Sequence, residues 1–444
     1  MEKPPERVAF LCYNIYMSKE NEETLKIYEY FGNAYLNNAH KRRAEKVREV
    51  KEKRTKAILS GLAVLGEDAR VLEIGSADGE VALLTKELGF KAYASDVSSQ
   101  FLAAIAKTGL PYYKFNVLKD DLDGRKFDGI IAFRVFVHFT PEDFAEALVK
   151  IYKLLRPGGR FVSDILNIED KGGKTCEWCD FGNGYEIGAD RFFYYYDEKQ
   201  VKDIIKNAGF RLEDFYLSGG DSGYKWFNFV LAKPSGIRPE VEECIKKKIL
   251  PKYEKLSGHT ITHINQVISR SLAIAEDLPE VDRDMVYVIA AYHDLGRLVD
   301  DETHNIESGK MVRKDKELKK LFDEKQIEVI AEAVEDHRAS LKGDPRSIYG
   351  RIVSSADRYM DLDDMLARSY DYTRHLHPEM SDDEVIEEAR IHLREKFKPD
   401  GYGAKKVYYP SIDDKECFET IERITRDPLA YRKIVKEFNK KRGK

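Results

Sequence analysis

The sequence predicts an α/β domain followed by an all-α domain, and three observations support this prediction. Short apolar runs alternate with helical patterns in the first half of the chain, which is typical of a parallel sheet covered by helices. The segment KPSGIRPE at 233–240 then has the Pro and Gly content of a linker. After Glu240 the helical periods follow one another, no clear strand pattern occurs, and eight of the ten histidines lie beyond residue 258.

Six apolar runs are predicted as strands, namely 71–75, 92–96, 112–117, 127–133, 160–166 and 227–233. Helical patterns at 80–88 and 141–155 separate some of them. Apolar stripes in the second half predict helices over 259–277, 282–295, 324–337, 346–370 and 382–396. We therefore expect domains at 20–233 and 244–444, joined by a linker at 234–243.

The composition restricts the class of protein. Of the 444 residues, 42% are hydrophobic and 34% charged, which excludes a disordered chain, a collagen and a disulfide scaffold. The formal net charge of -5 gives no electrostatic reason to expect general binding to nucleic acids or membranes. Five cysteines, an odd number, predict a reducing compartment and hence the cytoplasm. No apolar run approaches the roughly 18–20 residues that cross a bilayer.

The N-terminus has an apolar run at 8–17, but acidic Glu2 and Glu6 precede it and no small-residue cleavage site follows. We therefore expect no secretory signal. The polar sequence after Met17 leads to the hypothesis that translation starts at Met17.

The segment VLEIGSADG at 71–79 lies at the first predicted strand-to-helix turn. Glycine at Gly75 and Gly79 lets the backbone approach a ligand closely. The next predicted strand ends in Asp96, where a carboxylate accepts hydrogen bonds from ribose hydroxyls. The dinucleotide fingerprint is not met, because Ala77 and Glu80 stand at two of its three glycine positions.

The acidic residue and the two glycines at this spacing resemble the class I S-adenosylmethionine-dependent methyltransferases, a Rossmann-like family. The resemblance covers about residues 25–233 and includes three further motifs in order: KFDGIIAFRVFVHF at 126–139, LLRPGGRF at 154–161 and YYYDEKQVKDIIKNAGF at 194–210. It implies methyl transfer from S-adenosylmethionine to a small-molecule acceptor. The residues that it implies for cofactor binding are Glu73, Gly75, Ser76, Ala77, Gly79, Asp96, Asn116, Val117, Phe133 and Arg134.

Other residues of the first half have plainer interpretations. We expect His138, in the apolar run FVHF, to be structural, and Tyr28 and Tyr35 to pack rather than to close over a cofactor. The pair CEWC at 176–179 lacks the second pair that a structural zinc site usually needs. The basic stretch 41–56 contains interleaved glutamates and is interpreted as a solvated helix face, so nucleic acid is not an expected partner.

Histidines and aspartates recur along the helical half in a fixed order: His263, His293 with Asp294, His304, His337 and Asp357. Imidazole and carboxylate ligands suit Mn, Fe, Co, Ni or Zn, and Mg with water. Ile327, Ile330 and Val334 precede His337 at helical spacing, so His337 is predicted on the apolar face of its helix, where a buried imidazole needs a partner.

This order resembles the HD family of metal-dependent phosphohydrolases over roughly residues 255–375. The resemblance implies that His263, His293, Asp294 and Asp357 bind one divalent ion. Asp294 would then bridge to a second ion held by His304 and His337, with His304 expected on a loop. A metal-bound water would attack a phosphomonoester or phosphodiester, and a phosphorylated small molecule or nucleotide would be the substrate.

Arginines beside these ligands are candidates for binding the substrate phosphate, namely Arg297, Arg338 and Arg358, although surface ion pairs are the equally weighted alternative. We take Asp294, Arg297 and Arg338 as the candidate catalytic residues. His259 is expected near the substrate, and the last nine residues are expected to form a solvated basic tail.

The sequence therefore predicts a bifunctional fusion enzyme, with three alternatives open. The helical half could be a nucleotide sensor that does not cleave its ligand, or the first half could be an inactive scaffold for the hydrolase. Nucleic-acid modification is a third option, and it rests on the basic helix alone.

Overall fold

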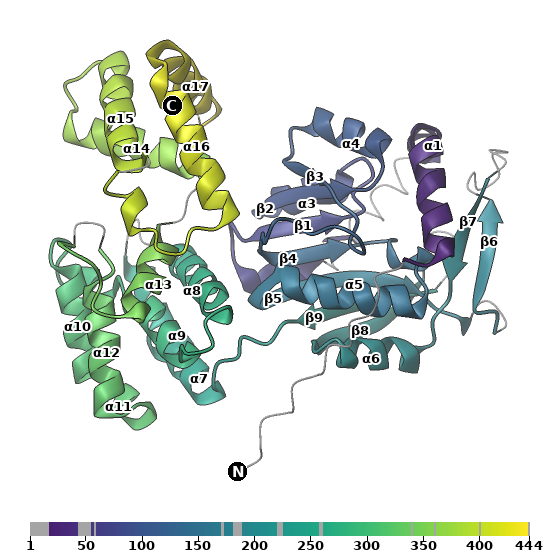
Figure 1. Cartoon of the computed structure of the whole chain (residues 1–444), viewed down its shortest axis with the longest axis horizontal. Coiled ribbons are helices and arrows are strands. Elements are labelled where there is room, and N and C mark those ends of the chain that lie inside the picture. The colour runs from purple at the N-terminus through teal and green to yellow at the C-terminus, as the bar shows by residue number, and fades with distance from the viewer. Residues whose placement is uncertain are drawn as a thin grey trace.

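The computed structural model describes residues 17–42, 55–56, 59–169, 173–180, 189–219, 225–256, 261–338, 341–358, 361–398 and 401–442 (Figure 1). Three predictions therefore concern residues outside this part of the chain: the N-terminal apolar run, most of the basic stretch 41–56, and His259. Among the described residues, no helix is long and apolar enough to cross a membrane.

A mixed sheet of seven strands forms the centre of the first half, counted over the described residues. Its order is β3 (Tyr112–Lys114), β2 (Lys91–Asp96), β1 (Arg70–Ile74), β4 (Phe127–Ala132), β5 (Leu155–Leu166), β9 (Lys225–Ala232) and β8 (Arg211–Gly219). The first five strands are parallel, and β9 runs antiparallel to both of its neighbours. From the β1–β4 pair, the strand order continues to β2 and β3 on one side and to β5 on the other. The order of the strands thus reverses between β1 and β4. In open α/β sheets, ligands bind at this switch point, beyond the carboxyl ends of the strands.

Helices cover both faces of this sheet, as the sequence predicts. They are α3 (Glu80–Glu87), α4 (Ser99–Ile105), α5 (Pro141–Leu154) and α6 (Glu198–Asn207). Every residue of β1 and β4 is buried, because a parallel strand with helices on both faces has no exposed side.

Two elements outside this α/β framework form a cap over the carboxyl ends of the strands. They are α1 (Lys19–Arg42) and a hairpin of β6 (Cys176–Asp180) and β7 (Asp190–Tyr194). The two parts are joined where the Phe192 backbone N–H donates to the hydroxyl of Thr24 at 3.0 Å. Figure 1 shows them side by side at the end of the sheet far from the helical half.

The helical half has two separate hydrophobic cores. The first lies within α7 (Pro239–Lys248), α8 (Ile261–Glu276), α9 (Arg283–Tyr292), α10 (His304–Lys314), α11 (Leu318–Leu321), α12 (Glu324–Glu335) and α13 (Ile348–Asp357). The second lies within α14 (Leu362–Leu376), α15 (Asp382–Phe397), α16 (Ile412–Arg426) and α17 (Pro428–Lys441), which we call the C-terminal bundle.

Three expectations about the helical half are wrong in detail. The helix expected at 346–370 is two helices, because Asp361 caps α14 by accepting from the Asp364 N–H at 3.1 Å and so starts a new helix. The expected basic tail is helical to Lys441, and Phe438 packs on the second core. The irregular linker covers only 233–238, since Pro239 opens α7 in the first-turn position that suits proline.

Charged pairs join the helical half to the amino ends of the strands, and we call this region the interdomain contact. Asp413 of α16 pairs with Arg70 and with Arg125, each at 2.5 Å, and Asp364 of α14 pairs with Lys91 at 2.9 Å. In each of these pairs the cation belongs to the α/β domain and the carboxylate to the C-terminal bundle.

Asp128 lies buried at the centre of the interdomain contact. Its carboxylate accepts from the guanidinium of Arg156 at 3.0 Å, from the backbone of Arg70 at 2.9 Å and from the hydroxyl of Ser269 on α8 at 2.6 Å. Although burial raises the pKa of Asp128, Arg156 and these hydrogen bonds together lower it below its usual value. Asp128 thus stays charged and belongs to the interdomain contact. It lies near the amino end of β4, away from the carboxyl ends of the strands.

We expect Asp128→Ala to lower the free energy of unfolding of the α/β domain by about 3–5 kcal/mol, because Arg156 stays buried without its carboxylate. Urea unfolding followed by tyrosine and tryptophan fluorescence measures this loss. Ser269→Ala removes only one hydrogen bond across the interdomain contact and should cost about 1 kcal/mol. Equal costs for the two variants would contradict a buried ion pair at this position.

Candidate functional site

The turn between β1 and α3 brings the predicted glycine loop against the end of β2. The Ala77 N–H donates to one oxygen of Asp96 at 3.0 Å, and the Ser98 N–H donates to the other at 3.0 Å. Gly75 has a φ of 73°, and a Cβ at this position would lie 2.5 Å from a methyl group of Val135. Glycine is therefore required at Gly75 for both the backbone angle and the close approach of β4.

A cavity of about 520 Å³ lies over this loop, at the switch point of the sheet. Nine of the ten residues that the sequence suggests for cofactor binding lie in its wall: Glu73, Gly75, Ser76, Ala77, Asp96, Asn116, Val117, Phe133 and Arg134. Gly79 is not among the lining residues; it has a φ of 80° and leads into α3. The predicted role of Gly79 in cofactor binding stays a prediction, and its positive φ suits the turn that leads into α3.

Two buried carboxyls of the wall have raised pKa values. Burial raises the pKa of Glu73 to about 8, against the lowering effect of hydrogen bonds from Ser76 and from the Ala82 N–H at 3.0 Å. Burial likewise raises the pKa of Asp96 to about 6, although three backbone hydrogen bonds oppose this. Asp96 is therefore ionised at neutral pH and available as an acceptor, whereas Glu73 is mostly protonated.

The cap adds side chains that the sequence did not assign to the site. The guanidinium of Arg191 donates to the Tyr28 hydroxyl at 2.7 Å, and this hydroxyl lies 2.9 Å from Nε2 of His138. Nδ1 of His138 lies 2.5 Å from the carbonyl oxygen of Phe192, so Nδ1 carries the proton and Nε2 accepts from Tyr28. Burial and Arg191 lower the pKa of His138 to about 3, which supports the structural role expected for this neutral histidine.

Arg134 has a left-handed backbone, with a φ of 62°, at the end of β4. Its N–H donates to Asp164 at 2.7 Å, and its guanidinium makes an ion pair with the same carboxylate at 3.1 Å. The guanidinium also lies 3.2 Å from the ring centre of Trp226. These contacts offset the cost of a strained backbone, and such strain is concentrated at functional sites.

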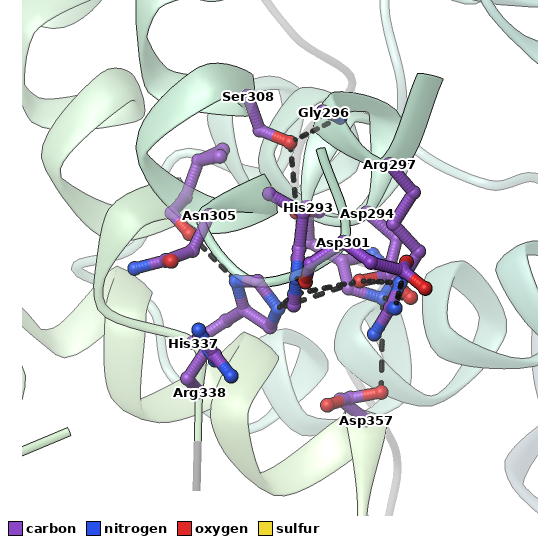
Figure 2. Close-up of polar contacts among 12 residues, drawn as sticks. His293, Asp294, Gly296, Arg297, Asp301, Asn305, Ser308, His337, Arg338 and Asp357 are labelled. Carbon is purple, nitrogen blue, oxygen red and sulfur yellow. Dashed lines mark hydrogen bonds and ion pairs between the residues drawn. The ribbon is translucent and has the colours of Figure 1, made fainter. Parts of the chain in front are cut away.

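The predicted ligand residues of the helical half converge on one centre (Figure 2). His263 lies in the first turn of α8, His293 and Asp294 directly follow α9, and His337 is the second residue after α12. Asp357 is the last residue of α13. His304 is the first residue of α10, so the expectation of a loop at this position is wrong.

The two oxygens of Asp294 face different pairs of histidines. One oxygen lies 3.4 Å from Nε2 of His293 and 3.8 Å from Nε2 of His263. The other lies 3.2 Å from Nε2 of His304 and 3.6 Å from Nε2 of His337. Two groups with the spacing of a metal site thus share this carboxylate.

Asp357 completes the first group, with one oxygen 3.2 Å from Nε2 of His263 and 3.6 Å from Nε2 of His293. All of the imidazoles therefore turn the same ring nitrogen, Nε2, toward a carboxylate. This arrangement suits an ion held between nitrogen and oxygen ligands.

Backbone carbonyls fix the proton on the outer nitrogen of three of these histidines. Nδ1 lies 2.8 Å from the Ala290 oxygen in His293, 2.7 Å from the Asp301 oxygen in His304 and 2.7 Å from the Val334 oxygen in His337. Such contacts orient metal-binding imidazoles and direct the Nε2 lone pair inward.

The inner nitrogens of His304 and His337 lie only 3.3 Å apart. Burial is the main cause that lowers the pKa of His304 to about 4, so its imidazole is neutral. Two lone pairs facing each other at this distance repel, and a shared cation relieves the repulsion. The donor set therefore fits a divalent metal ion.

The first group brings two carboxylates, those of Asp294 and Asp357, close to His293. Burial opposes a charge on His293, but Asp294 and Asp357 outweigh burial and raise its pKa to about 10. The pKa of Asp357 lies well below its usual value, because hydrogen bonds and charge from His263 and His293 outweigh burial.

The three candidate phosphate-binding arginines have different surroundings. Arg297 lies 3.1 Å from Asp294 and 2.6 Å from Asp301. Arg338 donates to the carbonyl of Glu302 on the other side of the centre (Figure 2). Arg358 is buried and donates to the carbonyls of His337, at 3.0 Å, and of Ser354. Arg358 thus fixes the end of α13, while Arg297 and Arg338 are partly exposed beside the ligands.

Sequence reasoning missed the cap residues because they lie in segments without a recognisable motif. Arg191 is a single cation directly before five aromatic residues, in the run RFFYYY at 191–196. A lone charge beside so many aromatic residues was the one sign in the sequence that could have indicated a site residue here. Trp226, at the start of β9, gave no signal, since its neighbours FNFVLA have the pattern of an ordinary buried strand.

Comparison with protein families gives one match in each half of the chain. Residues 39–214 match the model of a methyltransferase domain, and residues 260–360 match that of an HD domain. The C-terminal bundle lies beyond the second match. No curated protein matches the chain.

Solved structures resemble the α/β half. A magnesium protoporphyrin IX methyltransferase from Synechocystis with bound S-adenosylmethionine shares 12% identity and a TM-score of 0.38, over 49% of this chain and 98% of that one. A 1,6-didemethyltoxoflavin-N1-methyltransferase from Burkholderia thailandensis shares 20% identity and a TM-score of 0.37, over 48% and 90%. A putative S-adenosylmethionine-dependent methyltransferase from Listeria monocytogenes shares 12% identity and a TM-score of 0.35, over 40% and 96%.

Proposed function

Because the chain contains a methyltransferase domain at residues 39–214 and an HD domain at residues 260–360, we propose that it is a bifunctional enzyme. One activity transfers a methyl group from S-adenosylmethionine to a small molecule. The other is metal-dependent hydrolysis of a phosphomonoester or phosphodiester in a nucleotide-like substrate. The domains are proposed at 20–233 and 239–444, since α7 packs in the first core of the helical half.

The contact between Ala77 and Asp96 is the observation that supports the first activity, because the glycine loop and Asp96, the proposed ribose acceptor, line the same cavity. Asp96 would accept from the ribose hydroxyls, and Asn116 and Val117 would contact the adenine. When bound, S-adenosylmethionine supplies a methyl group on a sulfonium, which needs little acid–base help. The chain contributes mainly by aligning the acceptor.

The shared carboxylate of Asp294 carries the second activity. The proposed ligands of one ion are His263, His293, Asp294 and Asp357, and those of a second are Asp294, His304 and His337. A bound divalent ion supplies a water of lowered pKa and offsets charge on phosphoryl oxygens. Arg297 and Arg338, on the two sides of the centre, would bind the substrate phosphate.

Two measurements test the proposal on the full chain. Calorimetric titration with S-adenosylhomocysteine should show saturable binding, and hydrolysis of bis(p-nitrophenyl) phosphate should require added Mn²⁺ or a similar ion. Binding of nucleotides without hydrolysis under any metal would instead favour a sensor. Absence of S-adenosylhomocysteine binding would favour an inactive scaffold in the first half.

Affinity for S-adenosylhomocysteine is expected to fall at acidic pH. Burial raises the pKa of Asp96 to about 6, and only the ionised carboxylate accepts hydrogen bonds from both ribose hydroxyls. Binding is therefore complete above this pKa and weakens as the pH falls through it, by up to about tenfold for each further pH unit. Calorimetric titration over a pH series measures the change; the same affinity on both sides of the pKa would contradict the role of Asp96.

The proposed location is the cytoplasm. Within the described part of the chain, Cys176, Cys179, Cys244 and Cys417 are free thiols, which suits a reducing compartment.

A further inference from the structure

The cavity of the α/β domain has opposite charges on its two sides. The loop side of the wall carries the carboxylates of Asp78, Glu80 and Asp96, which suit the sulfonium and amino groups of S-adenosylmethionine. The β7 strand of the cap instead contributes the guanidinium of Arg191. The cap side thus favours a negatively charged ligand.

Arg191 is only 9% exposed and lies among aromatic rings. Its guanidinium is 4.9 Å from the ring centre of Phe193, 5.9 Å from that of Tyr35 and 6.0 Å from that of Tyr28. A cation in such surroundings attracts an anion more strongly than an exposed cation does, because water screens it less. The planar guanidinium also matches the two oxygens of a carboxylate or phosphate.

The remaining wall of this side is aromatic and contains one unsatisfied donor. Phe193, Tyr195 and Trp226 line the cavity together with Tyr28 and Tyr35. Trp226 is 5% exposed, and its indole N–H finds no acceptor among the described residues.

The polar groups around Arg191 are poor bases. Burial raises the pKa of Tyr28 to about 12, and burial together with Arg191 lowers the pKa of His138 to about 3. Nε2 of His138 is already occupied by the Tyr28 hydroxyl. An acceptor that needed a proton removed would find no suitable base beside Arg191. The acceptor must therefore arrive already deprotonated.

Resting on the methyl transfer proposed above, we propose that the methyl acceptor is a flat, conjugated molecule with an oxyanion, which Arg191 binds between the aromatic rings of the cap. In the reaction, an electron pair of the oxyanion forms the bond to the methyl carbon. The pair of the carbon–sulfur bond remains on sulfur as S-adenosylhomocysteine leaves. The positive and the negative charge cancel, and no proton is transferred.

Calorimetric titration of the full chain tests this class of acceptor. The probes are salicylate and phenyl phosphate, with salicylamide as the neutral counterpart, each titrated with and without S-adenosylhomocysteine. We expect the anions to bind at least about tenfold more tightly than salicylamide, and Arg191→Gln to remove this preference. Arg191→Lys should restore part of it, and Arg211→Gln, which alters an exposed arginine paired with Glu213, should leave it unchanged.

Three results would overturn the proposal: equal binding of salicylamide and salicylate, unchanged anion affinity in Arg191→Gln, or no binding of either anion. A further arm compares S-adenosylhomocysteine with methylthioadenosine, which lacks the amino-acid part. If Arg191→Gln weakened only the former, Arg191 would serve the cofactor carboxylate and the acceptor assignment would be wrong. Failure of S-adenosylhomocysteine to bind the native chain would count against the methyltransferase function, and the titrations without it would still decide the role of Arg191.

Discussion

Asp294→Ala is expected to abolish metal binding and phosphoester hydrolysis together. Both oxygens of Asp294 face pairs of histidine nitrogens, so its removal takes one ligand from each of the two groups. Removing a residue that hydrogen-bonds to a metal ligand typically lowers metal affinity or activity about 10–100-fold. Removing the carboxylate shared by both groups should therefore lower them by more than about a hundredfold.

Metal content per chain, measured by plasma mass spectrometry after equilibration with Mn²⁺, and the rate of bis(p-nitrophenyl) phosphate hydrolysis report this loss. His337→Ala removes a ligand of one group only and should leave about one ion where the native chain binds two. Asp277→Ala is the matched control, because Asp277 is an exposed carboxylate just beyond the opposite end of α8 from His263. Full metal content and rate in Asp294→Ala would refute the metal centre.

Asp96→Ala is expected to weaken S-adenosylhomocysteine binding by about a hundredfold or more. Hydrogen bonds to a charged group contribute about 1.5–3 kcal/mol each, and two ribose hydroxyls would lose their acceptor. The variant also frees the Ala77 and Ser98 N–H groups that shape the loop.

Asp96→Asn separates these two effects. An amide oxygen keeps one backbone hydrogen bond but removes the charge, so Asp96→Asn should bind more tightly than Asp96→Ala and less tightly than the native chain. Its affinity should also lose the dependence on pH that Asp96 confers. Native affinity in both variants would show that the ribose lies elsewhere.

The parts of the fold that could be predicted are those with a strong local pattern. The run FDGIIAF is apolar except at Asp128, so β4 was predicted within one residue at either end. The proposed metal ligands could be predicted because His and Asp are costly to bury, and five separate segments contain them in order. Burial of His293 and Asp294 follows from their place directly after α9, a helix whose residues Asp284–Tyr292 are all buried.

Other features depend on contacts between distant segments. The hairpin of β6 and β7 belongs to neither face of the main sheet, and Arg191 enters the cavity because β7 packs on α1. The segment 346–370 forms two helices because Asp361 caps the second of them. The apolar stripe continues on both sides of Asp361, and for this reason a single helix was predicted. His304 was expected on a loop because the helix it opens has little apolar periodicity.

The position of the interdomain contact separates the two chemistries in space. Arg70 and Lys91 are the first residues of β1 and β2, so the helical half contacts the amino ends of these strands. The cavity opens at the carboxyl ends of the same strands. A compound modified at one centre would have to diffuse out and around the molecule to reach the other. Fusion of the two domains therefore fixes their ratio at one to one and their synthesis at the same time.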